Sequence, residues 1–478
     1  MRPSALNVRS RDRLAAGAAG AFLFVWCFVL ERLLQHLPFD LDLFRPALLG
    51  QAFNSMAEHL AAGRFDVDPD AIDFEAFIVD DRTVSYFGVF CALLRLPLLP
   101  FPGLAHLDIT RLSCLAAVSM GAWFQVRAVL LVRGSVPAGP RRDWLTAALL
   151  VCILLGGQQI QFLRPSIYQE VVNWAGALAM GFVTLALRGL LTDRGFDWRT
   201  LTGMATFAGL ALLDRVSIGV GLYAALGGLL LLQWRRPVRA VVPGLLLLGF
   251  AAAVGVVNYG RWGNPLEFAD FTVYSLSQDV APDRLGRLSA YGAFNWRRIG
   301  ITLSYYFLPI WGLVRPDGQL LFAEAQVAMI DAIELPAGSF FVSDPLLVGL
   351  AAAFFITPSS PTMTSGARWP ARALLAGLAI PPALMLCAIS MAHRYRMEFY
   401  PFLVLAALLG FHALCRPGAP RFGRAARAAI VAAVVVSVVV SHGMAALYVV
   451  SPWGPAEQYI TKDGWIGTYA PRLRAGHD

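Results

Sequence analysis

The sequence is poor in charged residues and almost without lysine. Only 15% of its 478 residues are charged, whereas soluble globular domains carry roughly 25%. Lys462 is the only lysine, so arginine supplies nearly all of the formal +8 charge. These arginines stand between long apolar runs, where they set membrane topology, and not in a basic patch. We therefore expect no nucleic-acid partner and no soluble fold.

The chain also lacks the cysteine patterns of a secreted or metal-binding module. Its six cysteines show no close pairing and lie mostly in apolar segments, which excludes a disulfide framework and a thiolate metal site. They are Cys27, Cys91, Cys114, Cys152, Cys387 and Cys415. The basic amino terminus leads into an apolar run with no small-residue cleavage site after it, which predicts an uncleaved membrane anchor. Neither tandem repeats nor low-complexity segments stand out.

Long apolar runs dominate what is present. Hydrophobic residues make up 57% of the chain and the mean hydropathy is +0.60. A helix needs about 20 apolar residues to cross the hydrocarbon core of a bilayer. Nine runs reach or approach that length: Leu14–Leu34, Leu145–Leu163, Val171–Leu187, Val216–Leu232, Val238–Val257, Leu346–Ile356, Ala371–Met391, Phe402–Leu414 and Ala425–Val450.

Arginine sorts the loops between these runs into two sets. Every second loop is basic, as cytoplasmic loops are: 133–142, 188–199, 235–239, 368–372 and 416–427. This alternation predicts an all-α integral membrane bundle of about eleven transmembrane helices. Its amino terminus would be cytoplasmic and its carboxyl terminus periplasmic. The apolar segments 86–103 and 299–314 would break the alternation as spans, so we expect interfacial or re-entrant pieces there.

One membrane-embedded domain, residues 1–450, accounts for this pattern. It would carry a first periplasmic loop at about 38–108 and a second large one at about 258–345, with a short periplasmic tail at 451–478. Multi-pass insertion in the inner (plasma) membrane follows.

Carboxylates concentrate in the first periplasmic loop. The stretch 38–85 holds ten of them against three arginines, and several aromatic residues are interleaved with the acids. A solvated acidic loop is the ordinary interpretation of any one carboxylate. Aromatic residues at this density nevertheless indicate a loop packed on the membrane face. A partly desolvated carboxylate there can serve as a general base or bind a cation.

Other charges lie at the ends of apolar segments on the same predicted side. They are Arg164 and Glu170, the pair Asp214–Arg215, and Arg394, Arg396 and Glu398. Charges at membrane depth are costly, so they usually face a cavity or a partner, and an internal ion pair is the simplest alternative. The planar guanidinium of arginine matches phosphate oxygens, so this side suits an anionic ligand.

Four motifs in order resemble the GT-C-fold, polyprenyl-phosphate-sugar-dependent glycosyltransferases, in particular bacterial relatives of the ArnT/protein mannosyltransferase group. GRFDVDPDAIDFEAFIVDDRTVSYFGVFCALLRLPL (63–98) is similar to the family's first periplasmic loop and the segment after it. IYQEVVNWAGALAM (167–180) and NYGRWGNPLEF (258–268) resemble a helix entry and a segment that follows a helix. RYRMEFYPFLVLAALLG (394–410) resembles the opening of a late span.

The resemblance implies a function and a set of site residues. The chain would move a sugar from a polyprenyl-phosphate donor to a glycan, lipid or protein acceptor at the periplasmic face, with inversion. The implied catalytic base is one of Asp66, Asp68, Asp73 and Glu75. Donor phosphate contacts would come from Arg215, Arg261, Arg394 and Arg396, and the cavity lining from Tyr86, Tyr168 and Glu170. No cofactor is required by the sequence, although Asp66 and Asp68 could hold Mg²⁺ or Mn²⁺.

Two other classes of function stay open. A polytopic transporter or lipid flippase would place charges at the bilayer midplane and show related halves. A non-catalytic subunit of an envelope-polymer assembly machine could keep the fold and lose the acids. The acid-rich first loop and the clustering of charge on one predicted face favour the transferase.

Overall fold

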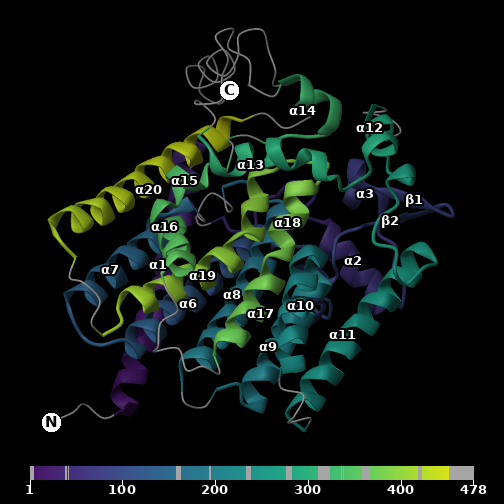
Figure 1. Cartoon of the computed structure of the whole chain (residues 1–478). Coiled ribbons are helices and arrows are strands. Elements are labelled where there is room, and N and C mark those ends of the chain that lie inside the picture. Colours follow the sequence, from purple (N-terminus) through teal and green to yellow (C-terminus); the bar gives the residue numbers. More distant parts are fainter. Residues whose placement is uncertain are drawn as a thin grey trace.

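The computed structural model describes a largely helical chain (Figure 1). The residues it describes are 5–37, 40, 42–157, 163–192, 195–232, 238–275, 283–309, 323–334, 336, 338–357, 367–417 and 422–451. The predicted periplasmic tail, apart from Ser451, lies outside the described residues.

Six stretches of helix are long and apolar enough to cross a membrane, judged by length and composition alone. They are α1 (Ala5–Leu34), α6 (Thr110–Ser135), α8 (Ile167–Leu191), α11 (Val238–Trp262), the consecutive helices α17 (Arg368–Leu378) and α18 (Ile380–Cys387), and α20 (Arg424–Val450). Three shorter apolar helices accompany them: α10 (Val216–Leu232), α16 (Pro345–Ile356) and α19 (Tyr400–Leu414). The bundle is completed by α7 (Pro140–Leu155) and α9 (Trp198–Asp214).

Seven of the nine apolar runs fall within one of these helices. The run Ala371–Met391 covers parts of α17 and α18 and ends four residues beyond α18. The run Leu145–Leu163 continues past the end of α7, and its residues 158–162 lie outside the described residues. Several chain segments therefore qualify as membrane spans, and the chain is a multi-pass membrane protein by composition. The number of membrane crossings stays a prediction, because α7, α9, α10, α16 and α19 are each shorter than 18 residues. The direction of each crossing also stays a prediction.

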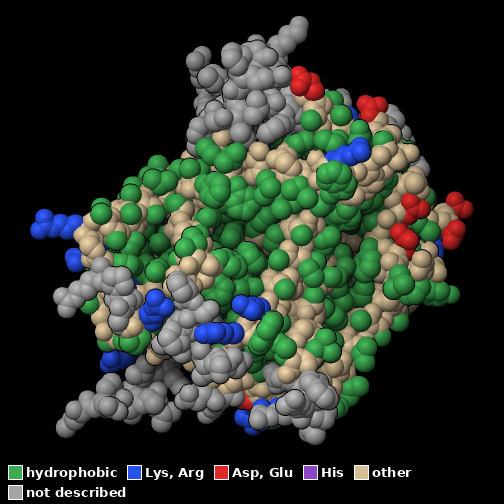
Figure 2. All heavy atoms as spheres, in the orientation of Figure 1, with side chains coloured by type: hydrophobic (Ala, Val, Ile, Leu, Met, Phe, Trp, Pro, Cys, Tyr) green, Lys and Arg blue, Asp and Glu red, His purple; other side chains and the backbone are tan. Residues whose placement is uncertain are grey.

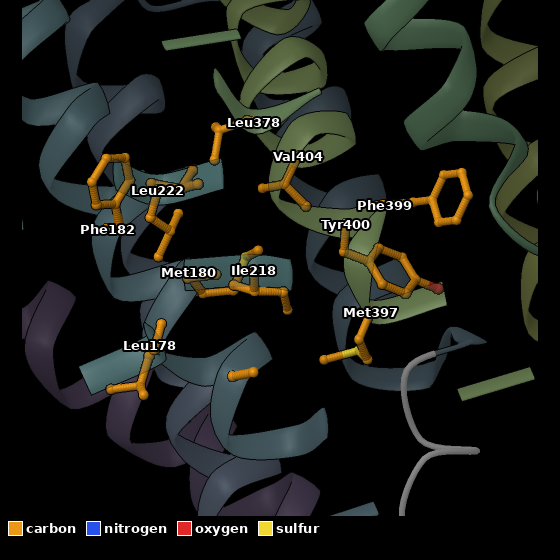
Figure 3. Packing of buried hydrophobic residues seen from close by; sticks show 14 of the residues in the cluster. Leu178, Met180, Phe182, Ile218, Leu222, Leu378, Met397, Phe399, Tyr400 and Val404 are labelled. Carbon is orange, nitrogen blue, oxygen red and sulfur yellow. The ribbon is translucent and has the colours of Figure 1, made fainter. Parts of the chain in front are cut away.

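Close helix contacts at glycine hold the centre of the bundle together. A Cβ atom at Gly410 of α19 would lie 1.9 Å from the carbonyl oxygen of Leu350 in α16. One at Gly377 of α17 would lie 2.2 Å from the backbone nitrogen of Ala225 in α10. Small residues at such contacts let membrane helices approach until their backbones pack. Figure 3 shows the buried side chains of α8, α10, α17 and α19 that fill the space between them.

Short elements gather at one end of the bundle, which we call the loop-rich end. They are α2 (Ala52–Ala61), α3 (Pro69–Ile72), η1 (Asp73–Glu75), β1 (Phe77–Val79), β2 (Arg82–Val84), α4 (Phe90–Leu93), η2 (Leu96–Leu98), α5 (Pro102–Ala105), η4 (Phe271–Val273), α12 (Asp283–Tyr291), η6 (Trp296–Arg298), α13 (Ile299–Phe307), α14 (Ala323–Met329), α15 (Phe340–Ser343) and η8 (His393–Glu398). In Figure 1 they occupy the top and right of the view. The segment 86–103 is thus broken into helices too short to span a bilayer. Of the segment 299–314, residues 310–314 lie outside the described residues, and the rest holds α13, whose nine residues are also too few.

Backbone hydrogen bonds join segments that are far apart in the sequence at this end. Ser275 donates its N–H to the carbonyl of Ala76 at 2.9 Å, and Glu334 donates to Met391 at 2.8 Å. Ile167 likewise donates to Leu48 at 3.2 Å. The described parts of the loops that arginine assigned to the periplasm therefore lie together. In the face seen in Figure 2, most acidic side chains lie at the upper right and most basic ones at the lower left.

The first loop departs from the all-α prediction in one place. Strands β1 and β2 form an antiparallel hairpin in which Phe77 pairs with Val84. Its turn residues Asp80 and Asp81 both have positive φ, 49° and 60°, as a two-residue type I′ turn requires. An Asp-Asp pair is an uncommon choice for this turn, so the hairpin could not be predicted from its turn residues.

Candidate active site at the loop-rich end

Two of the predicted catalytic acids, Asp66 and Asp68, flank one histidine. Helix α2 presents Ser55 and His59 on one face because they are four residues apart. The His59 ring lies with Nδ1 3.0 Å from Asp66 Oδ1 and Nε2 3.3 Å from Asp68 Oδ1. Ser55 donates its hydroxyl to Asp68 at 2.7 Å. Both acids are therefore already engaged with α2.

The pKa of Asp66 is held below its usual value. Partial burial acts to raise it, but the hydrogen bond to His59 and the nearby positive charge of Arg64 outweigh that effect. Asp66 is therefore an ionised acceptor and a weak base at neutral pH. Among the described residues, no group of three or more histidine, cysteine, aspartate or glutamate side chains could hold a metal ion. A divalent cation at Asp66 and Asp68 stays a prediction.

The other two predicted acids, Asp73 and Glu75, belong to the same 3-10 turn and differ in burial. Asp73 is exposed and has a φ of 48°, whereas the Glu75 side chain is buried, with 5% of its surface exposed. The hydroxyl of Tyr168, at the start of α8, donates a hydrogen bond to Glu75. Burial raises the pKa of Glu75, against the opposing effects of the Tyr168 and Tyr274 hydroxyls and the charges of Arg284 and Arg394. Glu75 thus has the properties of a base that titrates nearer to neutral pH.

Aromatic rings form the walls around Glu75. Tyr86 and Phe87 lie 4.3 Å apart between ring centres, and Phe87 lies 5.7 Å from Tyr168. The guanidinium carbon of Arg394 sits 4.5 Å from the centre of the Tyr168 ring. A tyrosine thus bridges a carboxylate and a cation.

The second predicted phosphate contact, Arg215, reaches the same place from the junction of α9 and α10. Its guanidinium lies 4.9 Å from the ring centre of Tyr395, and that of Arg394 lies 5.3 Å from the same ring. The side chains of Arg215 and Arg394 keep 20% and 14% of their surface exposed. We call Glu75, Tyr86, Tyr168, Arg215 and Arg394 the Glu75 site.

Each of these arginines has an acidic partner from another segment or position in the chain. Arg215 pairs with Glu398, which also accepts a hydrogen bond from Ser217 at 2.8 Å. Arg394 pairs with Glu334 at 3.2 Å. Arg215 therefore pairs with Glu398 and not with its neighbour Asp214, which accepts a hydrogen bond from the Cys91 thiol at 3.3 Å.

The structure places the remaining predicted residues away from Glu75. The carboxylate of Glu170 accepts two hydrogen bonds from Arg95, at 2.7 and 2.9 Å, inside the bundle. Arg396 is fully buried against Asp344 and Tyr400. Arg261 donates to the carbonyl of Phe87 at 2.7 Å, so it supports the wall of the Glu75 site from behind.

Three residues that contact members of the Glu75 site or their partners were not predicted from the sequence: Glu334, Tyr448 and Tyr274. The Tyr448 hydroxyl donates to Glu334 at 2.7 Å and accepts from Gln169 Nε2 at 2.6 Å. Tyr274 stacks on Phe77 with ring centres 4.6 Å apart, beside Glu75. Glu334 and Tyr274 lie in the second large loop and Tyr448 lies near the end of α20, and none of them stands in a recognisable motif.

Comparison with known proteins gives distant structural likenesses. No family model matches the sequence, and no curated protein does. The apo crystal structure of the oligosaccharyltransferase from Archaeoglobus fulgidus aligns over 92% of this chain with a TM-score of 0.49 and 12% identity. The same archaeal enzyme with an inhibitory peptide and a dolichol-phosphate gives 0.42 and 14%. With a tethered acceptor peptide it gives 0.41 and 13%. The chain spans 56–57% of the length of these structures.

Proposed function

We propose that the chain is a membrane glycosyltransferase of the GT-C type that moves a sugar from a polyprenyl-phosphate donor to an acceptor at the periplasmic face. The observation that carries the proposal is the Glu75 site, where a buried carboxylate with a raised pKa lies within the electrostatic reach of Arg394, and Arg394 shares the Tyr395 ring with Arg215. Such a pairing suits a reaction in which a proton is removed and a phosphate departs. The four sequence motifs support the same class of reaction.

The proposed step is a single displacement. Glu75 takes the proton of the acceptor hydroxyl or amine as the acceptor atom attacks the anomeric carbon of the sugar. The bond from that carbon to the phosphate oxygen breaks, and its electron pair leaves with the polyprenyl phosphate. Attack on the face opposite the phosphate inverts the anomeric centre.

The chain's own side chains would prepare this step. Tyr168 fixes Glu75 through its hydroxyl, and Arg394 lies over the Tyr168 ring close to where negative charge develops. Arg215, which lies near the same Tyr395 ring as Arg394, offers a second guanidinium for the phosphate oxygens. Glu75 is thus chosen over Asp66 and Asp68, which face His59.

The test is transfer of labelled sugar from polyprenyl-phosphate-linked donors to acceptors, catalysed by membranes that contain the full-length protein. Glu75→Gln keeps an oxygen for the Tyr168 hydroxyl but cannot take a proton, and we expect turnover to fall by roughly 10²–10⁴-fold. Asp73→Asn is the matched control, because Asp73 belongs to the same turn and is exposed. Full activity in Glu75→Gln at normal protein levels would refute Glu75 as the base.

A further inference from the structure

A second charged site lies where three long helices end at the loop-rich end. It is a cavity of about 490 Å³ between the last turns of α1 and α20, the first turn of α6 and two loop segments. Its polar lining consists of Arg45, Arg111, Arg164, Glu31, Gln35 and Ser166. None of these residues belongs to the Glu75 site. We call it the arginine cavity.

The arginine cavity carries an excess of positive charge. Three guanidinium groups face it and only one carboxylate, that of Glu31, lines it with them. Glu31 pairs with Arg111, and it also interacts electrostatically with Arg45. Among the described residues, Arg45 forms no direct ion pair. The cavity is therefore set up for an anion.

The arrangement is built into the fold and does not consist of surface arginines alone. Arg111 is 95% buried, and its Nε finds no hydrogen-bond partner among the described residues. Because this nitrogen is inaccessible to a ligand, Arg111 contributes its positive charge to the cavity and not an Nε hydrogen bond. Arg164 is held by the carbonyl of Ser451 at 2.6 Å and lies 5.1 Å from the ring centre of Tyr448. Two of the three arginines are thus positioned before any ligand arrives.

The surroundings of the arginine cavity favour a lipid as the carrier of the anion. Leu33 of α1 is 51% exposed, and Phe44 and Leu48 beside Arg45 are 41% and 45% exposed. Farther along α20, Val439 is 65% exposed. Arginines at the ends of apolar helices lie at the depth of lipid head groups, and apolar side chains next to them can contact acyl chains. Guanidinium groups match phosphate oxygens in geometry as well as charge.

We propose that the arginine cavity binds the phosphate group of an anionic membrane lipid, with the lipid chains lying along α1 and α20. This site is separate from the Glu75 site, and the inference does not depend on transferase activity. A chain of hydrogen bonds nevertheless connects the two sites. It runs from Ser166 in the arginine cavity to Gln169, from Gln169 to Tyr448, and from Tyr448 to Glu334. Glu334 then pairs with Arg394.

The experiment measures binding by the purified full-length protein in a neutral detergent, using calorimetry. The probes are dioctanoyl phosphatidic acid, dioctanoyl phosphatidylcholine as the zwitterionic lipid, and inorganic phosphate. We expect the phosphatidic acid to bind best. Arg45→Ala should weaken its binding by roughly tenfold, the loss of one charge-assisted hydrogen bond. Arg424→Ala, at an exposed position at the other end of α20, is the matched control and should bind normally.

A second variant guards against loss of folding. Because Arg111→Gln alone leaves Glu31 buried without a partner, it is combined with Glu31→Gln. This double variant should fold and bind phosphatidic acid at least as weakly as Arg45→Ala. Equal binding by wild type, Arg45→Ala and the double variant would overturn the proposal, as would binding of inorganic phosphate alone or of both lipids alike. Glu75→Gln should bind the lipid normally, so loss of transfer and loss of lipid binding are told apart.

Discussion

The guanidinium of Arg394 lies 4.5 Å from the ring centre of Tyr168, whose hydroxyl donates a hydrogen bond to Glu75. Tyr168 and Arg394 are far apart in the sequence, at the start of α8 and in η8. Through one aromatic ring the fold therefore holds the guanidinium of Arg394, which pairs with Glu334, near the carboxylate of Glu75. Burial raises the pKa of Glu75 by more than these two neighbours lower it, and this net rise underlies the pH behaviour expected of the protein.

Activity should depend on the ionisation of Glu75. Its raised pKa means that Glu75 is still partly protonated at pH values where an ordinary glutamate is fully ionised. We expect the acidic limb of kcat/KM to lie above the usual carboxylate range and to disappear from the residual activity of Glu75→Gln. A pH–rate profile from pH 4 to 9 measures this. A limb that persists in Glu75→Gln would assign the titration to another group.

The same pKa has a consequence for stability, with a defined sign. A carboxyl group whose pKa is raised by folding favours the folded state when it is protonated. Its contribution is therefore lost as pH rises through the folded-state pKa. Relative to wild type, Glu75→Gln, which is neutral at all pH values, should gain stability as pH rises from the ordinary carboxylate range to the folded-state pKa of Glu75. The gain should be constant above that pKa and absent below the ordinary range. Thermal unfolding of both proteins across the same pH range checks the expectation.

Arg215 should have a structural and a binding contribution that different substitutions separate. Arg215→Ala leaves Glu398, which is 1% exposed, without its cation, and we expect a loss of about 3–5 kcal/mol in unfolding free energy. Arg215→Lys keeps the ion pair with Glu398 but cannot donate two parallel hydrogen bonds to a phosphate. It should therefore weaken donor binding several-fold and leave the unfolding free energy nearly unchanged. Thermal unfolding and polyprenyl-phosphate binding are measured together. Normal lipid binding in both variants would remove Arg215 from the phosphate contacts.

The buried pair of Arg95 and Glu170 should behave as a structural unit. Arg95→Met alone strands the Glu170 carboxylate inside the bundle and should cost about 3–5 kcal/mol. The double variant Arg95→Met/Glu170→Leu should recover most of that loss, because neither charge remains to be compensated. Unfolding and transfer assays follow both variants. A double variant that is stable but inactive would show that Glu170 contributes to activity, as the sequence analysis expected of a cavity-lining residue.

Topology can be tested with single cysteines at positions 70 and 138, both of which are exposed. The arginine alternation predicts that Asp70→Cys reacts with a membrane-impermeant thiol reagent added from the periplasmic side and that Ala138→Cys does not. The native cysteines of the described chain are buried or half-buried, so background labelling should be low. Labelling of position 138 from outside would reverse the arrangement and move the Glu75 site to the cytoplasmic face.

Much of the helical bundle is determined by the sequence alone. Long apolar runs must form helices, because a bilayer leaves backbone N–H and carbonyl groups no other partner. The runs Leu14–Leu34, Val216–Leu232 and Ala425–Val450 accordingly coincide with α1, α10 and α20. The sequence also marked the first loop as the place where acids and aromatic residues concentrate, and Glu75 was among the four acids it selected.

Tertiary structure decided which of those residues meet. Asp73 and Glu75 are two positions apart in one turn, yet only packing against Tyr168 buries Glu75. Arg215 lies beside Asp214 in the sequence but pairs with Glu398 from another segment. Local periodicity fixes which way a side chain points from its own helix. The group that the side chain then contacts depends on the lateral packing of the helices. Long-range contacts such as those at Gly377 and Gly410 determine this packing.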